Sequence, residues 1–258
     1  MIRRALVFGA AFVGLAFLVL PVVAIFARVA PGRLIGQLGN AAVTDALRVS
    51  VETSAAAQAL VLLIGTPTAV VLARRFRFRE LLVSLVELPL VLPPAVAGLG
   101  LFAAFGRFGL LHTTIPFTKL AVIFAVAFVS GPLYVRAAIA AFEAVDGNIV
   151  AASRTLGAGA TRTFFRVVLP LARPGLAAGA ALALARGLGE FGATIMFAGS
   201  LRGVTETLPL AVYSEFNVDF DTALAVSALL VALSAALLIA LKWRPSLSTS
   251  RFRFAASS

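Results

Sequence analysis

Two charged residues stand inside an otherwise apolar stretch in the last third of the chain. Arg186 and Glu190 are four positions apart within the segment 176–198, a spacing that places both side chains on one face of a helix. An isolated charge at the centre of a lipid bilayer costs at least about 2.5–3.5 kcal/mol, so we expect the two residues to form an ion pair. Such a pair either lines a path or a gate through the membrane, or it only fixes the register of the helix.

Small residues surround this charged pair. Gly187, Gly189 and Gly192 flank the two charges, and small residues let membrane helices approach one another closely. We take Gly189, Gly192 and Thr194, with the charged pair itself, as candidates for a pathway or gate. The same glycines match the Gly-x-Gly-x-x-Gly dinucleotide pattern, but that pattern needs a preceding strand, and this segment predicts a continuous apolar helix.

Three prolines occupy a second apolar segment, residues 81–105. Pro89, Pro93 and Pro94 each remove a backbone donor, and proline inside a membrane helix bends it. Carbonyl groups freed by such a bend are poor partners for an oxyanion. We therefore include Pro93 and Pro94 among the pathway or gate candidates because they bend the helix, and not as ligands.

The chain lacks the residues that several kinds of catalysis require. It has no cysteine and a single histidine, so thiol catalysis, Cys-ligated metal centres and His-rich metal sites are excluded. A phosphate-binding loop needs lysine after glycine, whereas Lys119 and Lys242 follow threonine and leucine. We expect no catalytic residue, no metal and no cofactor in this chain, and any ATP hydrolysis must occur on another polypeptide.

The composition indicates a membrane protein. Of 258 residues, 61% are hydrophobic and 13% are charged, and the mean hydropathy is +1.04, whereas a soluble domain is about 25% charged. Because backbone polar groups in lipid must be bonded internally, we expect an all-α bundle of about six transmembrane helices in one domain, 1–258. The predicted spans are 5–27, 53–73, 81–105, 120–135, 176–198 and 222–241. The first span and an external loop occupy 1–44, the core occupies 45–242, and a tail occupies 243–258.

The positions of Lys and Arg predict the orientation. With the amino terminus in the cytoplasm, 15 of the 22 basic residues fall in cytoplasmic segments and 6 in external ones, as the positive-inside rule expects. Both termini are therefore predicted to be cytoplasmic. The net charge of +11 is explained by basic loops beside the anionic lipid bilayer, and not by nucleic-acid binding.

The longest cytoplasmic segment, residues 136–175, lies between the fourth and fifth spans. Its Ala-rich part, 148–165, predicts short amphipathic helices with a break at Gly157 and Gly159, and Leu169-Pro170 indicates the return to the membrane. The expected apolar anchors are Leu156, Phe164 and Phe165. The residues alone leave two interpretations open, a docking surface for a partner protein or a helix that lies on lipid.

This segment resembles the EAA motif of ABC-importer permeases, in which Glu-Ala-Ala is followed at fixed spacing by Gly, Ile and Leu-Pro. Ala151-Ala152-Ser153 stands at the first three positions, Gly157 follows, and nine residues separate it from Val167. Ala151 replaces the usual Glu, while the spacing agrees throughout. The resemblance implies a coupling helix that docks on an ATPase subunit through Ala151, Ala152, Ser153, Gly157, Ala158, Phe165, Leu169 and Pro170.

Four further stretches resemble the molybdate–sulfate branch of these permeases. Residues 87–98 and 186–195 are similar to its third-span and fifth-span motifs, and 154–159 and 203–209 are more similar to molybdate/tungstate members than to sulfate members. The resemblance implies the type I ABC importer permease fold in a prokaryotic inner membrane. It also implies a homodimer, ATPase subunits that bind ATP-Mg, an extracytoplasmic oxyanion-binding protein, and import of molybdate or tungstate.

Other functions remain as alternatives. One is a sulfate or thiosulfate permease of the same family. Another is a stand-alone secondary anion transporter or channel, although the halves of the chain show no convincing repeat. A membrane hydrolase would need a nucleophile with a base, or metal ligands, which one histidine and isolated acids do not supply.

Overall fold

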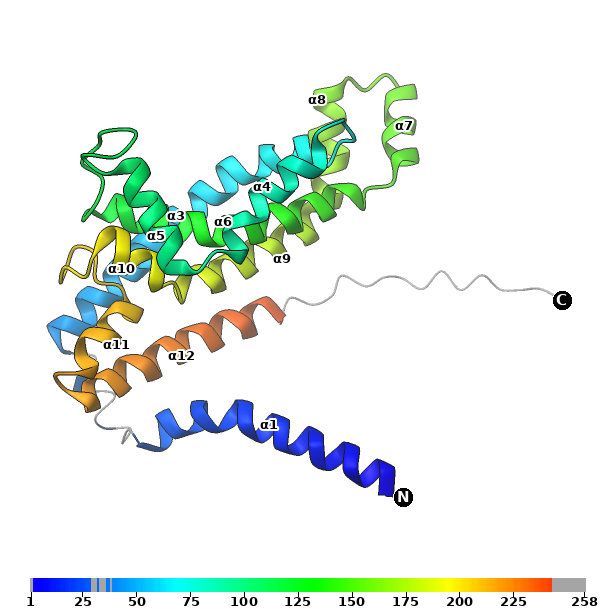
Figure 1. The fold of residues 1–258 in the computed structure, drawn as a ribbon. Coiled ribbons are helices and arrows are strands. Elements are labelled where there is room, and N and C mark those ends of the chain that lie inside the picture. Colours follow the sequence, from blue (N-terminus) through cyan, green and yellow to red (C-terminus); the bar gives the residue numbers. More distant parts are fainter. Residues whose placement is uncertain (1, 29–31, 33–35, 38, 243–258) are drawn as a thin grey trace.

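The computed structural model describes residues 2–28, 32, 36, 37 and 39–242, and within these residues every regular element is helical (Figure 1). The predicted tail, 243–258, lies outside the described residues. In chain order the helices are α1 (Ile2–Arg28), α3 (Ala41–Leu72), α4 (Arg79–Val91), α5 (Pro94–Phe105), α6 (Lys119–Glu143), α7 (Gly147–Thr155), α8 (Ala160–Thr163), the π-helix η1 (Phe164–Val168), α9 (Leu169–Leu188), α10 (Gly192–Ala198), α11 (Leu208–Phe216) and α12 (Phe220–Lys242).

Five of these stretches are long and apolar enough to cross a membrane by themselves. They are α1, α3, α6, the run from α8 to α9 and α12. A sixth is obtained only if α4 and α5 are counted together, although the two are bent by 114° at the break between them. The predicted bend at the prolines is therefore confirmed, and the predicted third span, 81–105, corresponds to two helices that meet at this bend.

The second span is longer than the hydropathy of its sequence indicated. Helix α3 begins after Asn40, whose side chain accepts a hydrogen bond from the amide of Ala42, so it starts twelve residues before the predicted span. Hydropathy excluded this first part because it carries charges. In the structure Glu52 pairs with Arg48 at 2.7 Å and with Lys119 of α6 at 2.6 Å, and mutual pairing lowers the cost of placing charges on a membrane helix.

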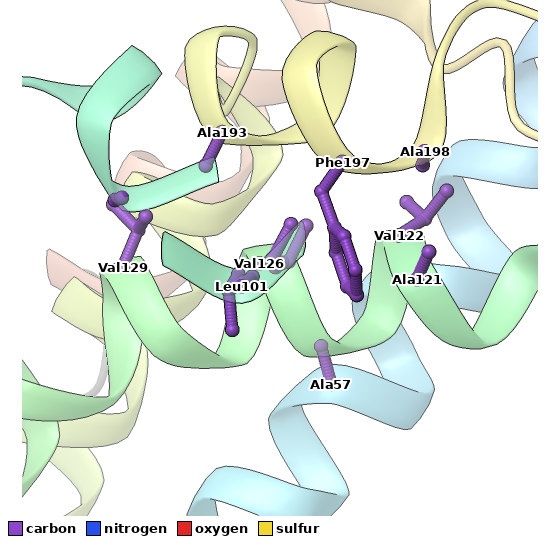
Figure 2. Packing of buried hydrophobic residues seen from close by; sticks show 11 residues of the cluster. Ala57, Leu101, Ala121, Val122, Val126, Val129, Ala193, Phe197 and Ala198 are labelled. Carbon is purple, nitrogen blue, oxygen red and sulfur yellow. The ribbon is translucent and has the colours of Figure 1, made fainter. Parts of the chain in front are cut away.

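The core is built around α6, against which α3, α9 and α10 pack. Figure 2 shows Phe197 of α10 reaching down between the helices toward Val126 and Leu101. Complete burial of a phenylalanine side chain contributes about 1.5–3 kcal/mol. The short helix α10 is thus fixed to the centre of the bundle by its own side chains, in spite of its seven residues.

Helix α1 lies apart from the bundle and makes only a few contacts with α12. Its large apolar side chains are exposed, as expected for a helix that faces lipid. The first turn of α1, the last turn of α12 and the helix α7 all lie toward the same end of the molecule (Figure 1).

The segment 136–175 was expected to connect two spans, with short helices in 148–165, and most of it is helical. Residues 136–143 complete α6, and α8, η1 and α9 form one unbroken helix from Ala160 to Leu188. Pro170 lies within this helix, directly after the π-helical turn η1 and at the start of α9. The part that projects from the bundle is therefore shorter, residues 144–168, and is called here the α7–η1 segment.

Candidate functional site

The Arg186–Glu190 ion pair forms, but on a different backbone from the one predicted. Nη2 of Arg186 lies 2.8 Å from Oε2 of Glu190, so the pairing is confirmed. The prediction of one continuous helix is wrong, because α9 ends at Leu188 and α10 begins only at Gly192. Arg186 therefore lies in the last turn of one helix, and Glu190 lies in the short link before the next.

Glu190 stabilises the break in which it lies. Its Oε1 accepts a hydrogen bond at 2.8 Å from the amide of Ala193 in the first turn of α10. A carboxylate in this position satisfies a free amide and interacts favourably with the positive end of the helix dipole. Gly189 favours the end of α9 because glycine costs about 1 kcal/mol in a helix interior. The break thus has a local cause in the two residues that follow Leu188.

The two charges differ sharply in their exposure. The side chain of Glu190 is 1% exposed, whereas that of Arg186 is 36% exposed. The contact between them does not have hydrogen-bond geometry, so Oε2 of Glu190 is buried without a hydrogen-bond partner. A guanidinium group has five N–H donors, and the hydrogen bonds of the described residues use none of those of Arg186. The pair presents a cation to the surface and keeps its carboxylate inside.

The break after α9 lies against the break before α5. A Cβ atom at Gly192 would lie 2.6 Å from Cβ of Pro94, and one at Gly98 would lie 2.6 Å from the carbonyl oxygen of Ala193. Pro93 is the N-cap of α5, with ψ 133°, and Pro94 is its first residue. The structure therefore brings Pro94, Gly192 and Glu190 together, at the junction of two interrupted spans.

The other two candidates of this group are placed differently. Gly189 has no neighbouring atom within 4 Å of a Cβ built on it, so no described element approaches it closely. Thr194 is completely buried, and its hydroxyl has no hydrogen-bond partner.

The α7–η1 segment has the shape that its sequence indicated. Asp146 caps α7 by accepting a hydrogen bond from the amide of Asn148 at 2.8 Å. The chain then turns at Gly157, whose φ of +82° is a conformation that residues with a side chain rarely adopt. The hydroxyl groups of Ser153 and Thr163, 2.8 Å apart, join α7 to the end of α8 across this turn. The predicted break at Gly157 is confirmed.

The apolar side chains of this segment serve different purposes. Phe164 is half-buried and packs on Phe142 of α6, with ring centroids 6.2 Å apart. Leu156 and Phe165 were also expected to be anchors, yet they are 88% and 60% exposed, so they anchor nothing within the described chain. The remaining docking candidates on the segment are exposed (Ala151, Ala152 and Gly157) or half-buried (Ser153 and Ala158), and two more lie just after it at the start of α9, half-buried Leu169 and exposed Pro170.

Several ion pairs at the ends of the helices were missed in the sequence. Arg79 of α4 pairs with Glu143 of α6, and Arg136 of α6 pairs with Glu87 of α4 at 3.5 Å. Their spacing gave a signal that could have been used, because each helix has an Arg and a Glu about two turns apart, Arg79 and Glu87 on α4 and Arg136 and Glu143 on α6. Which charge meets which depends on the packing of α4 on α6, and the sequence does not contain that information locally.

The family described as "Binding-protein-dependent transport system inner membrane component" matches residues 62–243, well over half of the chain. The chain belongs to this family. It is 42% identical over 247 residues to the molybdenum transport system permease protein ModB of Mycobacterium tuberculosis, covering 93% of this chain and 94% of that protein. It is 36% identical over 225 residues to a probable molybdenum ABC transporter permease of Haloferax volcanii, covering 85% and 82%.

A solved structure supports the same fold. A chain of the MetNI methionine ABC transporter, in a structure described as inward facing, aligns with a TM-score of 0.59 and 20% identity, covering 78% of this chain and 91% of that one. The bundle therefore has the ABC importer permease fold that the EAA-like segment implied. Membership of the family makes this chain a multi-pass inner-membrane permease that works with a binding protein and with a separate ATPase subunit. The secondary transporter, channel and hydrolase alternatives are thereby excluded.

Proposed function

We propose that this permease forms the path through which molybdate or tungstate enters the cytoplasm. The observation that carries the proposal is the 42% identity to ModB of Mycobacterium tuberculosis over 94% of that protein. The substrate is a tetrahedral dianion, and the surface that receives it needs a cation.

Arg186 is the residue that we assign to the dianion. Its guanidinium group is partly exposed, and its charge is fixed beside the break between α9 and α10 by the buried carboxylate of Glu190. Because the carboxylate is buried, the anion meets the guanidinium group and makes no direct contact with Glu190. Pro93, Pro94 and Gly192 shape the adjoining break of α4 and α5, and we place the gate at this junction, with Gly189 and Thr194 on either side of the charged link.

The α7–η1 segment is the site at which we expect the ATPase to dock. It projects from the bundle (Figure 1) and exposes Leu156 and Phe165, two apolar side chains that a docked ATPase would cover. In the assembly that we propose, two copies of this chain form the path, two ATPase subunits bind ATP-Mg, and an oxyanion-binding protein delivers the substrate from outside. Both termini are then cytoplasmic, because α1 begins and α12 ends toward the side of α7.

The experiment that tests this function is uptake into proteoliposomes. The permease is reconstituted with its ATPase and binding protein, and ATP-dependent uptake of molybdate, tungstate and sulfate is measured. We expect molybdate and tungstate to be taken up and to compete with each other, with sulfate much weaker. Strong uptake of sulfate without uptake of molybdate would assign the chain to the sulfate alternative.

A further inference from the structure

Helix α4 is held to the bundle by little apolar contact. None of its residues is buried, and Val83 and Val86 are its half-buried side chains that pack on the core around α6. Residues 79, 83, 86 and 87 recur at helical spacing and so share one face. The two valines are thus bracketed by a basic residue, Arg79, and an acidic one, Glu87.

Two ion pairs join this face to α6. Arg79, the first residue of α4, pairs with Glu143, the last residue of α6, and Glu87 pairs with Arg136 two turns earlier on α6. The order of charges fits only an antiparallel arrangement, since a parallel one would place Arg79 near Arg136 and Glu87 near Glu143. We call these two contacts the α4–α6 ladder.

Arg79 has a wider set of contacts than the ladder alone. Its Nε donates to the carbonyl oxygen of Leu72, the last residue of α3, at 2.8 Å, and its Nη1 contacts Glu80 at 2.6 Å. The last carbonyl groups of a helix lack partners within it, and they lie at the negative end of its dipole. One guanidinium group therefore joins the ends of α3 and α6 to the start of α4, and its side chain is only 20% exposed.

The end of α6 leads directly into the α7–η1 segment. Glu143 is three residues before Asp146, the N-cap of α7. Phe142, next to Glu143, packs on Phe164 of η1. The α7–η1 segment is thus joined, through neighbouring residues at the end of α6, to the first contact of the ladder.

We propose that Arg79 and Arg136 are positioning residues for transport, which hold α4 to the end of α6 through Glu143 and Glu87. Helix α4 is one half of the broken span at the gate, so the ladder makes α4 follow the α7–η1 segment when the ATPase moves that segment. This inference rests on the proposed function, because it uses the assigned docking site and the assigned gate. Without the ladder, ATP hydrolysis continues while fewer anions cross the membrane.

The first test measures molybdate transported per ATP hydrolysed in proteoliposomes that contain the whole complex. Arg79→Gln and Glu143→Gln should each lower this ratio by about fivefold or more, the lower end of the range for coupling between two sites. The double variant should be no worse than the more severe single variant, because both changes remove the same contact. Arg75→Gln is the matched control: Arg75 is exposed, lies in the same basic turn and takes part in no ion pair of the described residues.

The second test measures distance, and it uses the absence of cysteine from the chain. Spin labels at Ser84→Cys and Ala140→Cys, both at exposed positions on α4 and α6, report the separation of the two helices. Arg79→Gln should broaden the distance distribution. The second contact is tested by a charge swap. Arg136→Glu alone should lower the molybdate transported per ATP, and adding Glu87→Arg should restore much of that loss.

The possible failures can be told apart. Wild-type complex without ATP-driven molybdate uptake would refute the proposed function. The role of the ladder would be refuted, and the proposed function kept, if the wild-type complex takes up molybdate while Arg79→Gln changes neither the molybdate transported per ATP nor the distance between α4 and α6. Losses that multiply in the Arg79→Gln, Glu143→Gln double variant would also overturn it. If Arg79→Gln does not accumulate in the membrane, the molybdate transported per ATP is measured in Arg136→Gln instead, because Arg136 is exposed.

Discussion

Gly192 and Pro94 are in such close contact that no side chain fits between them. A Cβ atom at Gly192 would lie 2.6 Å from Cβ of Pro94 and 3.4 Å from the amide nitrogen of Ala95. Pro94 starts α5 and Gly192 starts α10, so the contact joins the first turns of two helices that each follow a break. The position of one break is thereby tied to the position of the other.

Gly192→Ala should therefore disturb the junction. The added methyl group meets a proline ring and backbone, which cannot rotate away, and overpacking of this kind costs about 1–3 kcal/mol. We expect a lower melting temperature in detergent and a large loss of uptake. Gly100→Ala on α5 is the control, because a Cβ there meets nothing within 4 Å. Equal melting temperatures for the two variants would show that the junction is loose.

The Arg186–Glu190 pair should respond unequally to loss of its two members. Arg186→Met leaves a carboxylate that is 1% exposed without its cation, and breaking a buried pair in this way costs about 3–5 kcal/mol. Glu190→Gln is expected to be milder, because the amide oxygen can still cap α10 and Arg186 can still reach the surface. Thermal unfolding of the purified variants gives the order, and a more stable Arg186→Met would contradict it.

The double variant, Arg186→Met with Glu190→Gln, separates the roles of the pair. It removes both charges, so it should be more stable than Arg186→Met alone. If Arg186 binds the dianion or holds the gate, as we propose, this variant folds but does not take up molybdate. Uptake near the wild-type rate would reduce the pair to a structural role. Arg186→Lys is a useful comparison, since it keeps the charge and loses the planar fork.

The order of the spans was predictable, because a bilayer requires long apolar helices whatever the details of their packing. The breaks were less predictable. Around Glu190 the sequence is apolar on both sides, and the helix stops because a carboxylate caps the next helix and because Pro94 meets Gly192. These are side-chain and tertiary contacts, and the mean hydropathy of a window does not detect them.

The charged ends of the helices show the same limit. The first turns of α3 were left out of the predicted span because they carry Arg48 and Glu52. The local sequence does not show that Glu52 also pairs with Lys119 of α6. In contrast, the turn at Gly157 was predicted correctly, because a positive φ in a short connection selects glycine and leaves a direct trace in the sequence. The turn at Gly157 and the Arg186–Glu190 pair were thus recovered from the sequence, whereas the cap of α10 by Glu190 and the contacts between distant segments were not.

The orientation can be tested with reporters. The Lys and Arg count of 15 against 6 predicts that a carboxyl-terminal reporter that is active only in the cytoplasm will be active. A reporter placed in the link between α10 and α11, residues 199–207, should behave as extracytoplasmic. The opposite result at both sites would place the α7–η1 segment outside, and the docking of an ATPase there would then be impossible.

The last prediction concerns the surface of the α7–η1 segment. Leu156 is 88% exposed and contributes little to the stability of the isolated permease, so Leu156→Ser should leave its melting temperature nearly unchanged. If the segment docks on the ATPase, the same variant should copurify with much less ATPase and should lose uptake.

Gly157 provides a second, independent test of the turn. Gly157→Val forces a β-branched residue into φ +82°, whereas Gly157→Asn is better tolerated because asparagine adopts this conformation more readily. ATPase copurification should therefore fall in the order glycine, asparagine, valine, and Gly159→Ala, at an ordinary φ of −65° with open space around it, should remain close to wild type. Normal copurification in both Leu156→Ser and Gly157→Val would mean that the ATPase contacts the permease elsewhere.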